Sequence, residues 1–158
     1  MLNLQRAVEM MAATARLDVV GVSSVYQSPP WGYQSENDYY NAVATVDWDG
    51  PPLRLLEHCY RIEAALGRHR AGQSDYDGYR DRTVDLDIIW LDGIETESDR
   101  LILPHPSAHR RAFVLVPLIE LAPRLELHGH SAEHWLAEMD AADASAVTLV
   151  DGPGLLVS

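Results

Sequence analysis

The residues of this chain best suited to chemistry are two aspartates two positions apart, Asp85 and Asp87, in the run RTVDLDIIW over residues 82–90. Apolar and charged residues alternate in this run, which predicts a strand with both carboxylates on one face, roughly 6–7 Å apart. Carboxylates that close repel each other unless a cation lies between them. Magnesium bound to a polyphosphate is the natural cation, because it prefers one or two carboxylates together with phosphate oxygens. The alternative is an exposed strand face that carries two solvated acids.

All basic residues other than histidine are arginines, and the chain contains no lysine. A phosphate-loop lysine, a protein-kinase lysine and a Schiff-base lysine are therefore excluded. Seven arginines fall in the stretch around the two aspartates: Arg68, Arg70, Arg80, Arg82, Arg100, Arg110 and Arg111. Guanidinium groups bind phosphate through two parallel hydrogen bonds, so this cluster beside paired acids suits a magnesium-bound nucleotide. A compositional bias against lysine is the alternative explanation.

Length and composition predict one globular domain over residues 1–158. The net charge of −12 argues against a nucleic-acid partner. The chain has no apolar run of membrane-spanning length and no basic start followed by an apolar stretch, so we expect no membrane partner and a cytoplasmic location. The single cysteine, Cys59, excludes an internal disulfide and is expected to be a buried structural thiol.

Periodicity and turn residues predict alternating helices and strands. Helices are expected from the start of the chain towards Leu17, over 53–66 with Gly67 as C-cap, over 114–122 with Pro117 in the first turn, and over 131–139 with Ser131 as N-cap. Strands are expected over 17–26 and 39–48, joined as a long-looped hairpin, over 82–90 and 100–105, and at the tail edge over 146–150 and 154–157. Asp92 and Gly93 predict a tight turn with a short hairpin that returns through Ile94. Residues 68–81 form a polar loop of the length expected for a lid or binding loop.

Five ordered features carry a family resemblance: YQSPPWG at 26–32, NDYYNAV at 37–43, RIE at 61–63 with Gly67 and Arg68, RTVDLD at 82–87, and LPH at 103–105 followed by RAFVLVPL at 111–118. Together they resemble the signature of 6-hydroxymethyl-7,8-dihydropterin pyrophosphokinase, a folate-pathway enzyme family. The resemblance covers about residues 3–125 and leaves a C-terminal helix and tail over 126–158.

The resemblance implies an α+β fold, a ferredoxin-like-derived three-layer α/β/α arrangement with a mainly antiparallel central sheet. It implies transfer of the β,γ-pyrophosphoryl unit of ATP to the hydroxymethyl group of the reduced pterin, leaving AMP. ATP would be the co-substrate, and two Mg²⁺ ions would bridge Asp85 and Asp87 to the triphosphate. Such a transfer depends mainly on positioning and on neutralising charge, which suits acids and arginines. The partners would be small-molecule substrates, and we expect a monomer, with fusion or adjacency to another folate-pathway enzyme as a further expectation.

The resemblance also assigns residues to roles. The catalytic set is Arg68, Arg70, Arg82, Asp85 and Asp87, of which the two aspartates hold the metal. ATP would be bound by Tyr60, Glu63, Arg82, Ile88, Arg100, Ile102, His105 and Arg111. The pterin would lie against Ser28, Pro29, Pro30, Trp31, Tyr39, Asn41, Tyr79, Asp85 and Phe113, with Phe113 and Tyr79 as the stacking rings. Asparagine offers both a donor and an acceptor to the pterin edge.

Blander interpretations stay open for two of these residues: Phe113 as a core aromatic, and His105 as a residue that caps a turn. The other histidines lack ligand spacing and are expected to be surface or core residues.

The chain departs from the family at its start, where the family's first strand, which ends in Gly-Ser-Asn, has no counterpart. We expect a clipped version of a longer protein, with filling of the gap by the tail strand over 146–150 or by another subunit as alternatives.

Two rival functions stay open. One is a magnesium-dependent nucleotidyltransferase, and the other is an inactive or truncated subunit that binds a pterin or a nucleotide.

Overall fold

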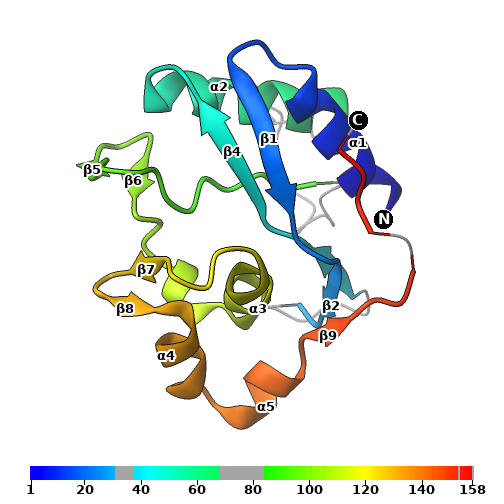
Figure 1. Ribbon diagram of the computed structural model, residues 1–158, viewed down its shortest axis with the longest axis vertical. Coiled ribbons are helices and arrows are strands. Elements are labelled where there is room, and N and C mark those ends of the chain that lie inside the picture. Colours follow the sequence, from blue (N-terminus) through cyan, green and yellow to red (C-terminus); the bar gives the residue numbers. More distant parts are fainter. Residues whose placement is uncertain (31–37, 68–83, 153, 158) are drawn as a thin grey trace, which may run out of the picture.

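The computed structural model describes residues 1–30, 38–67, 84–152 and 154–157. The helices are α1 (Leu2–Ala12), α2 (Pro52–Ala65), the 3₁₀ helix η1 (Ala108–Arg110), α3 (Ala112–Leu121), α4 (Ala132–Ala137) and α5 (Ala141–Ser145). The strands are β1 (Leu17–Val22), β2 (Tyr26–Ser28), β3 (Tyr39–Asn41), β4 (Ala44–Trp48), β5 (Thr96–Glu97), β6 (Ile102–Leu103), β7 (Glu126–Leu127), β8 (His130–Ser131) and β9 (Thr148–Leu149). In Figure 1 the β1–β4 ribbon lies in front of α2, with α1 beside β1, and α3, α4 and α5 lie in the other half of the molecule. The fold is therefore mixed α and β with small antiparallel sheets.

The predicted long hairpin is confirmed, but each of its two strands is interrupted. β1 pairs with β4 in antiparallel register from Leu17 opposite Trp48, and β2 pairs with β3, with Ser28 opposite Tyr39. Between β1 and β2, the Ser23 N–H donates to the Val43 carbonyl, and the Ser23 hydroxyl accepts from the Val43 N–H, both at 2.9 Å. The Ser23 hydroxyl here accepts in place of a backbone carbonyl, so the two sides of the hairpin stay paired although the regular β-ladder is interrupted.

Glu120 of α3 connects the segment between β1 and β2 to the helical half of the molecule. Its Oε1 accepts from the Ser24 N–H at 2.9 Å and from the Ser24 hydroxyl at 3.0 Å, and its Oε2 accepts from the Tyr26 hydroxyl at 2.9 Å. Three bonds to one carboxylate tie the β1–β2 connection to α3 and explain why the predicted single strand over 17–26 divides there.

The predicted strand at the aspartates is wrong for the part described, residues 84–90, which joins no ladder among the described residues. The alternation of its side chains is confirmed only over residues 84–88, where both aspartates are exposed. Beyond residue 88 it ends, because Ile89 packs on the cluster of α3 and Trp90 is exposed. Val84 and Leu86 pack in a cluster with Ala7 of α1 and Ile62 of α2, and Ile88 packs with the cluster of Leu56, Leu101 and Leu103. α2 thus supports the segment along its length without strand pairing. Helix α2 ends as expected, with Gly67 at a φ of +95° just beyond its last turn.

The second half of the molecule packs α3 against α4, η1 and the β7–β8 hairpin, around fully buried Leu115 and Leu127. Pro117 lies at the sixth position of α3, so the prediction of a first-turn proline is wrong, because the helix begins two residues earlier than expected. The predicted N-cap is confirmed, since the Ser131 hydroxyl accepts from the His134 N–H at 3.2 Å. α4 ends at Ala137, two residues earlier than predicted, and a separate short helix, α5, follows.

The turn at Asp92 and Gly93 is confirmed, with Gly93 at a φ of +65° and the Ile94 N–H bonded to the Leu91 carbonyl at 3.1 Å. The strands that pair after it are β5 and β6, so the predicted return through Ile94 is wrong. The extended segment predicted over residues 100–105 contains β6.

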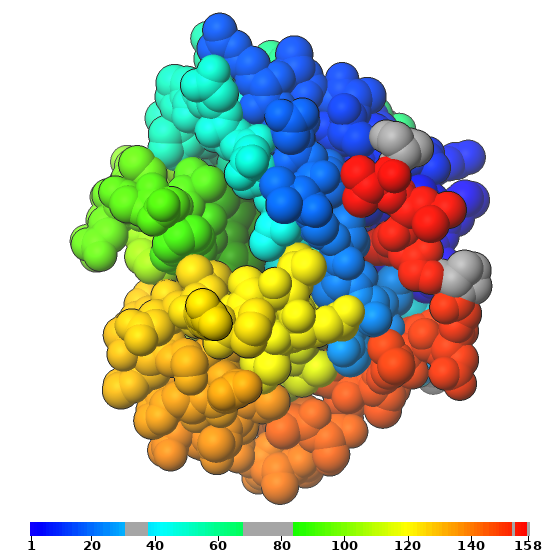
Figure 2. Space-filling view, viewed as in Figure 1, coloured from blue at the N-terminus to red at the C-terminus, as the bar shows by residue number. Residues whose placement is uncertain are grey.

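The chain's tail returns to the first half of the molecule. β9 pairs with the free edge of β2, with Leu149 opposite Tyr26. The tail strand predicted over 146–150 is therefore confirmed for Thr148–Leu149 only, and it lies beside β2 rather than beside the aspartate segment. Residues 154–157 form no strand, contrary to the prediction. They lie along α1, where the Gln5 amide donates to the Leu156 carbonyl and accepts from its N–H, each at 3.0 Å (Figure 2). Within the described residues no helix is long and apolar enough to cross a membrane.

Candidate active site

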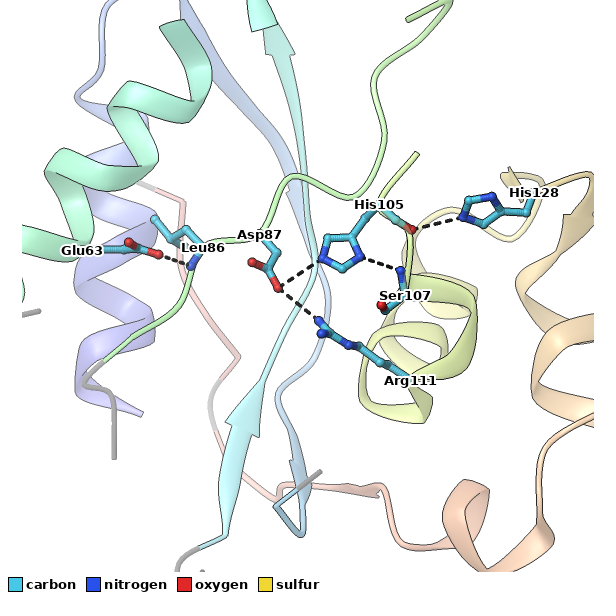
Figure 3. A network of polar contacts seen from close by, with 7 residues as sticks. All are labelled: Glu63, Leu86, Asp87, His105, Ser107, Arg111 and His128. Atoms are coloured by element: carbon cyan, nitrogen blue, oxygen red, sulfur yellow. Dashed lines mark hydrogen bonds and ion pairs between the residues drawn. The ribbon is translucent and has the colours of Figure 1, made fainter. Parts of the chain in front are cut away.

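Asp87 reaches two cationic or polar side chains that come from a distant part of the chain. The Arg111 guanidinium donates to Asp87 Oδ2 at 3.3 Å, and His105 Nε2 lies 3.9 Å from the same oxygen (Figure 3). Arg111 is the N-cap of α3, and the His105 N–H donates to the Ile89 carbonyl at 2.8 Å. The Asp87 side chain keeps 50% of its surface exposed, so it is open to a further ligand from solvent.

The hydrogen bonds of His105 define which ring nitrogen carries a proton. Its Nδ1 accepts from the Ser107 N–H at 3.1 Å, so the neutral ring carries its proton on Nε2, the nitrogen that faces Asp87. Burial lowers the pKa of His105, the neighbouring Asp87 opposes that shift, and Arg111 and His128 add to it, with the net direction downward. A neutral His105 therefore offers an N–H donor beside a carboxylate.

His128 holds the backbone of His105 in place. Its Nε2 lies 3.1 Å from the His105 carbonyl oxygen, and because a carbonyl oxygen accepts, the ring nitrogen donates. His128 adopts a φ of +51°, a left-handed backbone conformation that few residues other than glycine favour. Sequence reasoning placed this residue among the surface or core histidines, and it had no signal to use, since the partner is a backbone carbonyl.

Asp85 is exposed, like Asp87, while the residues on either side of it point into the apolar clusters at α1 and α2. Two accessible carboxylates two positions apart are the donor set that a hard cation with phosphate oxygens requires, so the residues fit a magnesium-bound polyphosphate. In the described part of the chain no group of three or more histidine, cysteine or acidic side chains could hold a metal by itself.

The residues assigned to ATP gather around α2 and the segment after the aspartates. Tyr60 and Ile88 are half-buried in one cluster with Leu101 and Leu103, the neighbours of Ile102, which itself is 43% exposed. Arg100 lies at the surface, with its guanidinium 3.6 Å from Glu57 of α2. Tyr60 and Ile88 thus lie in one cluster, and Arg100 reaches the same helix, α2.

Glu63, also assigned to ATP, is differently placed, because it is buried with 1% of its surface exposed. Its Oε1 accepts from the Leu86 N–H at 2.9 Å.

The residues assigned to the pterin lie at the far end of the hairpin. The Asn41 amide donates to the Ser28 hydroxyl at 2.9 Å, with Ser28 only 4% exposed, and Tyr39 stands opposite Ser28 in the β2–β3 register. Pro29 and Pro30 follow directly, Pro29 exposed and Pro30 partly buried.

Phe113 packs on the α3 cluster together with Val43, which follows β3 in the chain, and the guanidinium of Arg111 lies 5.8 Å from the centre of its ring. The predicted aromatic, rim and nucleotide positions therefore meet across α3. Trp31, Arg68, Arg70, Tyr79 and Arg82, together with the predicted loop over 68–81, lie outside the described residues.

A guanidinium and an imidazole beside one of two exposed carboxylates offer donors to phosphate oxygens and acceptors to a hard cation, so the site suits a magnesium-bound polyphosphate. A family model described as 7,8-dihydro-6-hydroxymethylpterin-pyrophosphokinase matches residues 1–123. The chain belongs to this family, and the resemblance inferred from its motifs is confirmed.

Curated relatives give the same result. The chain is 40% identical to the 2-amino-4-hydroxy-6-hydroxymethyldihydropteridine pyrophosphokinase of Methylorubrum extorquens over 144 residues, which is 91% of this chain and 88% of the relative. It is 38% identical to the protein of the same name from Haemophilus influenzae over 125 residues, 79% of this chain and 75% of the relative. The Bifunctional protein FolKE of Lactococcus lactis is 30% identical over 140 residues, 89% of this chain and 39% of that longer protein.

Proposed function

We propose that this protein is an ATP-dependent pyrophosphokinase of folate biosynthesis that acts on 6-hydroxymethyl-7,8-dihydropterin. The hydroxymethyl oxygen attacks the β-phosphorus of ATP and loses its proton, the bond from that phosphorus to the oxygen bridging it to the α-phosphorus breaks, and AMP leaves. The observation that carries the proposal is the meeting of Asp87, Arg111 and His105 beside exposed Asp85, in a chain of this family.

The side chains divide the work as their chemistry suggests. Arg111 and the Nε2–H of His105 supply donors for phosphate oxygens and for the charge that builds up during transfer. Asp85 and Asp87 would hold Mg²⁺, which when bound neutralises phosphate charge and orients the triphosphate. Tyr60, Ile88, Arg100 and Ile102 would contact the nucleotide. Tyr60 and Ile88 pack in one cluster with Leu101 and Leu103, the neighbours of Ile102. Arg82 would contact the nucleotide, and Arg68 and Arg70 would close over the reaction. These three roles rest on the sequence motif alone.

The pterin would lie between the β2–β3 end of the hairpin and α3. Phe113 would stack on the ring with Tyr79 opposite, while Ser28, Tyr39 and Asn41 read its edge, as does the backbone near Pro29, Pro30 and Trp31. Support comes from the Asn41–Ser28 bond, which fixes the amide, and from the position of Phe113 next to Arg111, which brings the ring site near the phosphate site. An aromatic face and an amide are a suitable surface for a flat heterocycle.

Several finer expectations stay proposals: two Mg²⁺ ions rather than one, a single domain over 1–158, a monomer, a cytoplasmic location, and the three-layer ferredoxin-like arrangement. The strands described here form sheets of two and three strands, so a continuous central sheet is part of the proposal. Fusion to another folate-pathway enzyme is supported as a pattern of the family by the bifunctional relative of Lactococcus lactis.

The decisive experiment is a product assay with ATP, Mg²⁺ and 6-hydroxymethyl-7,8-dihydropterin. Formation of AMP with the pterin diphosphate in equal amounts is the expected result. Release of pyrophosphate with a nucleotide transferred to the acceptor would instead select a nucleotidyltransferase. Calorimetric binding of both substrates without any product would select an inactive binding subunit, and either result refutes the proposal.

A further inference from the structure

Asp85 and Asp87 lie on a segment that has no strand partner in the described part of the chain, although it carries the side chains on which the reaction depends. In a sheet, ladder hydrogen bonds hold a segment in register, and a slip of one residue moves every side chain to the opposite face. In the described part of the chain, contacts other than ladder bonds hold this register. A slip by one residue would exchange the two carboxylates with the apolar residues next to them.

The apolar side of the segment is held by α2. Val84 and Leu86 pack against Ile62 of α2. Ile88 packs beside Leu56, which lies on the same helix, four residues before Tyr60. Apolar packing is not directional, so these contacts favour the observed face without defining the orientation of each peptide group.

The directional contact comes from Glu63, which follows Ile62 on α2. Its Oε1 accepts a hydrogen bond of 2.9 Å from the Leu86 N–H, on the residue that lies between the two aspartates (Figure 3). The Glu63 carboxylate is 1% exposed, which excludes water as a competitor and makes this acceptor part of the interior. Figure 3 shows Glu63 and Asp87 on opposite sides of the segment, so Glu63 acts on the backbone and not on the aspartate side chain.

We propose that Glu63 is a positioning residue that replaces a ladder acceptor at Leu86 and thereby holds both metal-binding aspartates in register, rather than a residue that contacts ATP. The inference rests on the proposed function. Anchoring the Leu86 N–H defines the peptide plane between Asp85 and Leu86, and Asp87 follows one residue later, so one bond orients both carboxylates. Residues that orient metal ligands in this way change metal affinity or activity by about 10–100-fold when they are removed.

Two substitutions separate the roles of Glu63. Glu63→Gln keeps a side-chain oxygen that can accept from Leu86, while Glu63→Met has similar length and no comparable acceptor. Glu138→Met removes an exposed acid at the end of α4 and serves as the matched control. We expect Glu63→Met to lose about 10–100-fold in kcat and to need more Mg²⁺ for half-maximal turnover, with KM for the pterin unchanged. Glu63→Gln should retain turnover within about threefold of the parent, since it keeps the bond.

Hydrogen exchange of the Leu86 amide gives a readout without substrates. In the parent protein and in Glu63→Gln this amide should exchange at least about 10²-fold more slowly than in an unstructured peptide, and in Glu63→Met the protection should fall at least tenfold. If Glu63→Met does not fold, protection of Leu86 in the parent and in Glu63→Gln, together with the activity of Glu63→Gln, decides the matter.

Three results would overturn the inference: unchanged kcat and Mg²⁺ dependence in Glu63→Met, an unprotected Leu86 amide in the parent, or a rise in KM for ATP alone in Glu63→Gln. The last result would identify Glu63 as a nucleotide contact. A parent enzyme that forms no AMP would refute the proposed function itself, while the Leu86 exchange would still report on the bond.

Discussion

Replacing Asp87 by asparagine separates the role of this carboxylate in catalysis from its role in stability. The change keeps the size of the side chain and removes its charge, which pairs with Arg111 at 3.3 Å. At this distance two unit charges attract with about 1.3 kcal/mol in a water-like dielectric and about 5 kcal/mol at an effective dielectric constant near 20. The Asp87 side chain is 50% exposed, so the lower value applies, and after desolvation and ordering of side chains the pair contributes about 0–1 kcal/mol to folding.

In a domain of this size, about 1 kcal/mol lowers the melting temperature by about 2–4 °C. The effect of Asp87→Asn on turnover is expected to be much larger than this effect on stability. Loss of a group that stabilises charge in the transition state lowers kcat by about 10²–10³-fold, equivalent to about 2.7–4 kcal/mol. We therefore expect Asp87→Asn to melt within about 4 °C of the parent and to lose at least about 10²-fold in AMP formation, with pterin binding retained.

The assay is AMP formation over a Mg²⁺ titration, with melting followed by fluorescence and pterin binding by calorimetry. Asp92→Asn is the matched control, because it removes the same charge at an exposed turn. The Asn-Gly sequence that results in the variant favours a tight turn as the original Asp-Gly does. Turnover of Asp87→Asn within tenfold of the parent would refute a metal-binding role. A fall in melting temperature above about 8 °C would show instead that Asp87 serves mainly to hold the fold, and the reasoning from its exposure would be wrong.

Three further predictions concern the scaffold. Leu115→Ala, at a position with 0% exposure, should lower the free energy of unfolding by about 2–5 kcal/mol in urea denaturation, and a change below about 1 kcal/mol would contradict its place in the core. Burial pushes the pKa of Glu120 up, but the bonds from Ser24 and Tyr26 outweigh it and hold that pKa below its ordinary value of 4.5. The carboxylate thus stabilises the fold above pH 4.5 and loses this effect as the pH falls through the depressed folded-state pKa. The difference in unfolding free energy between the parent and Glu120→Gln should therefore shrink in acid. A constant difference from pH 7 to pH 3 would count against a stabilising role for the bonds from Ser24 and Tyr26 to Glu120. Burial raises the pKa of Cys59 to about 11, so the folded protein should react with a thiol reagent at pH 8 much more slowly than the urea-unfolded chain, and equal rates would exclude a buried thiol.

Local patterns predicted where the helices lie, with ends that differ by a few residues. α2 begins at Pro52, one residue before its predicted start, and the Ser131 N-cap and the Asp92–Gly93 turn are in place. These features depend on a few neighbouring residues, which a single sequence displays completely. The strands predicted over 17–26 and 39–48 form but are each interrupted, and the described part of the strand predicted over 82–90 joins no ladder among the described residues. Strand formation depends on partners distant in the chain, which a local pattern does not show.

The sequence by itself determined the side-chain alternation around Asp85 and Asp87, the reliance on arginine, and the family, since these are properties of residue type and spacing. The tertiary structure alone decided which groups meet them. The bonds from Arg111 to Asp87, from His128 to the His105 carbonyl and from Leu86 to Glu63 join residues 23 or 24 positions apart. Two of the three involve a backbone group, and since every residue carries the same backbone donor and acceptor, no residue type in the sequence marks which one is used.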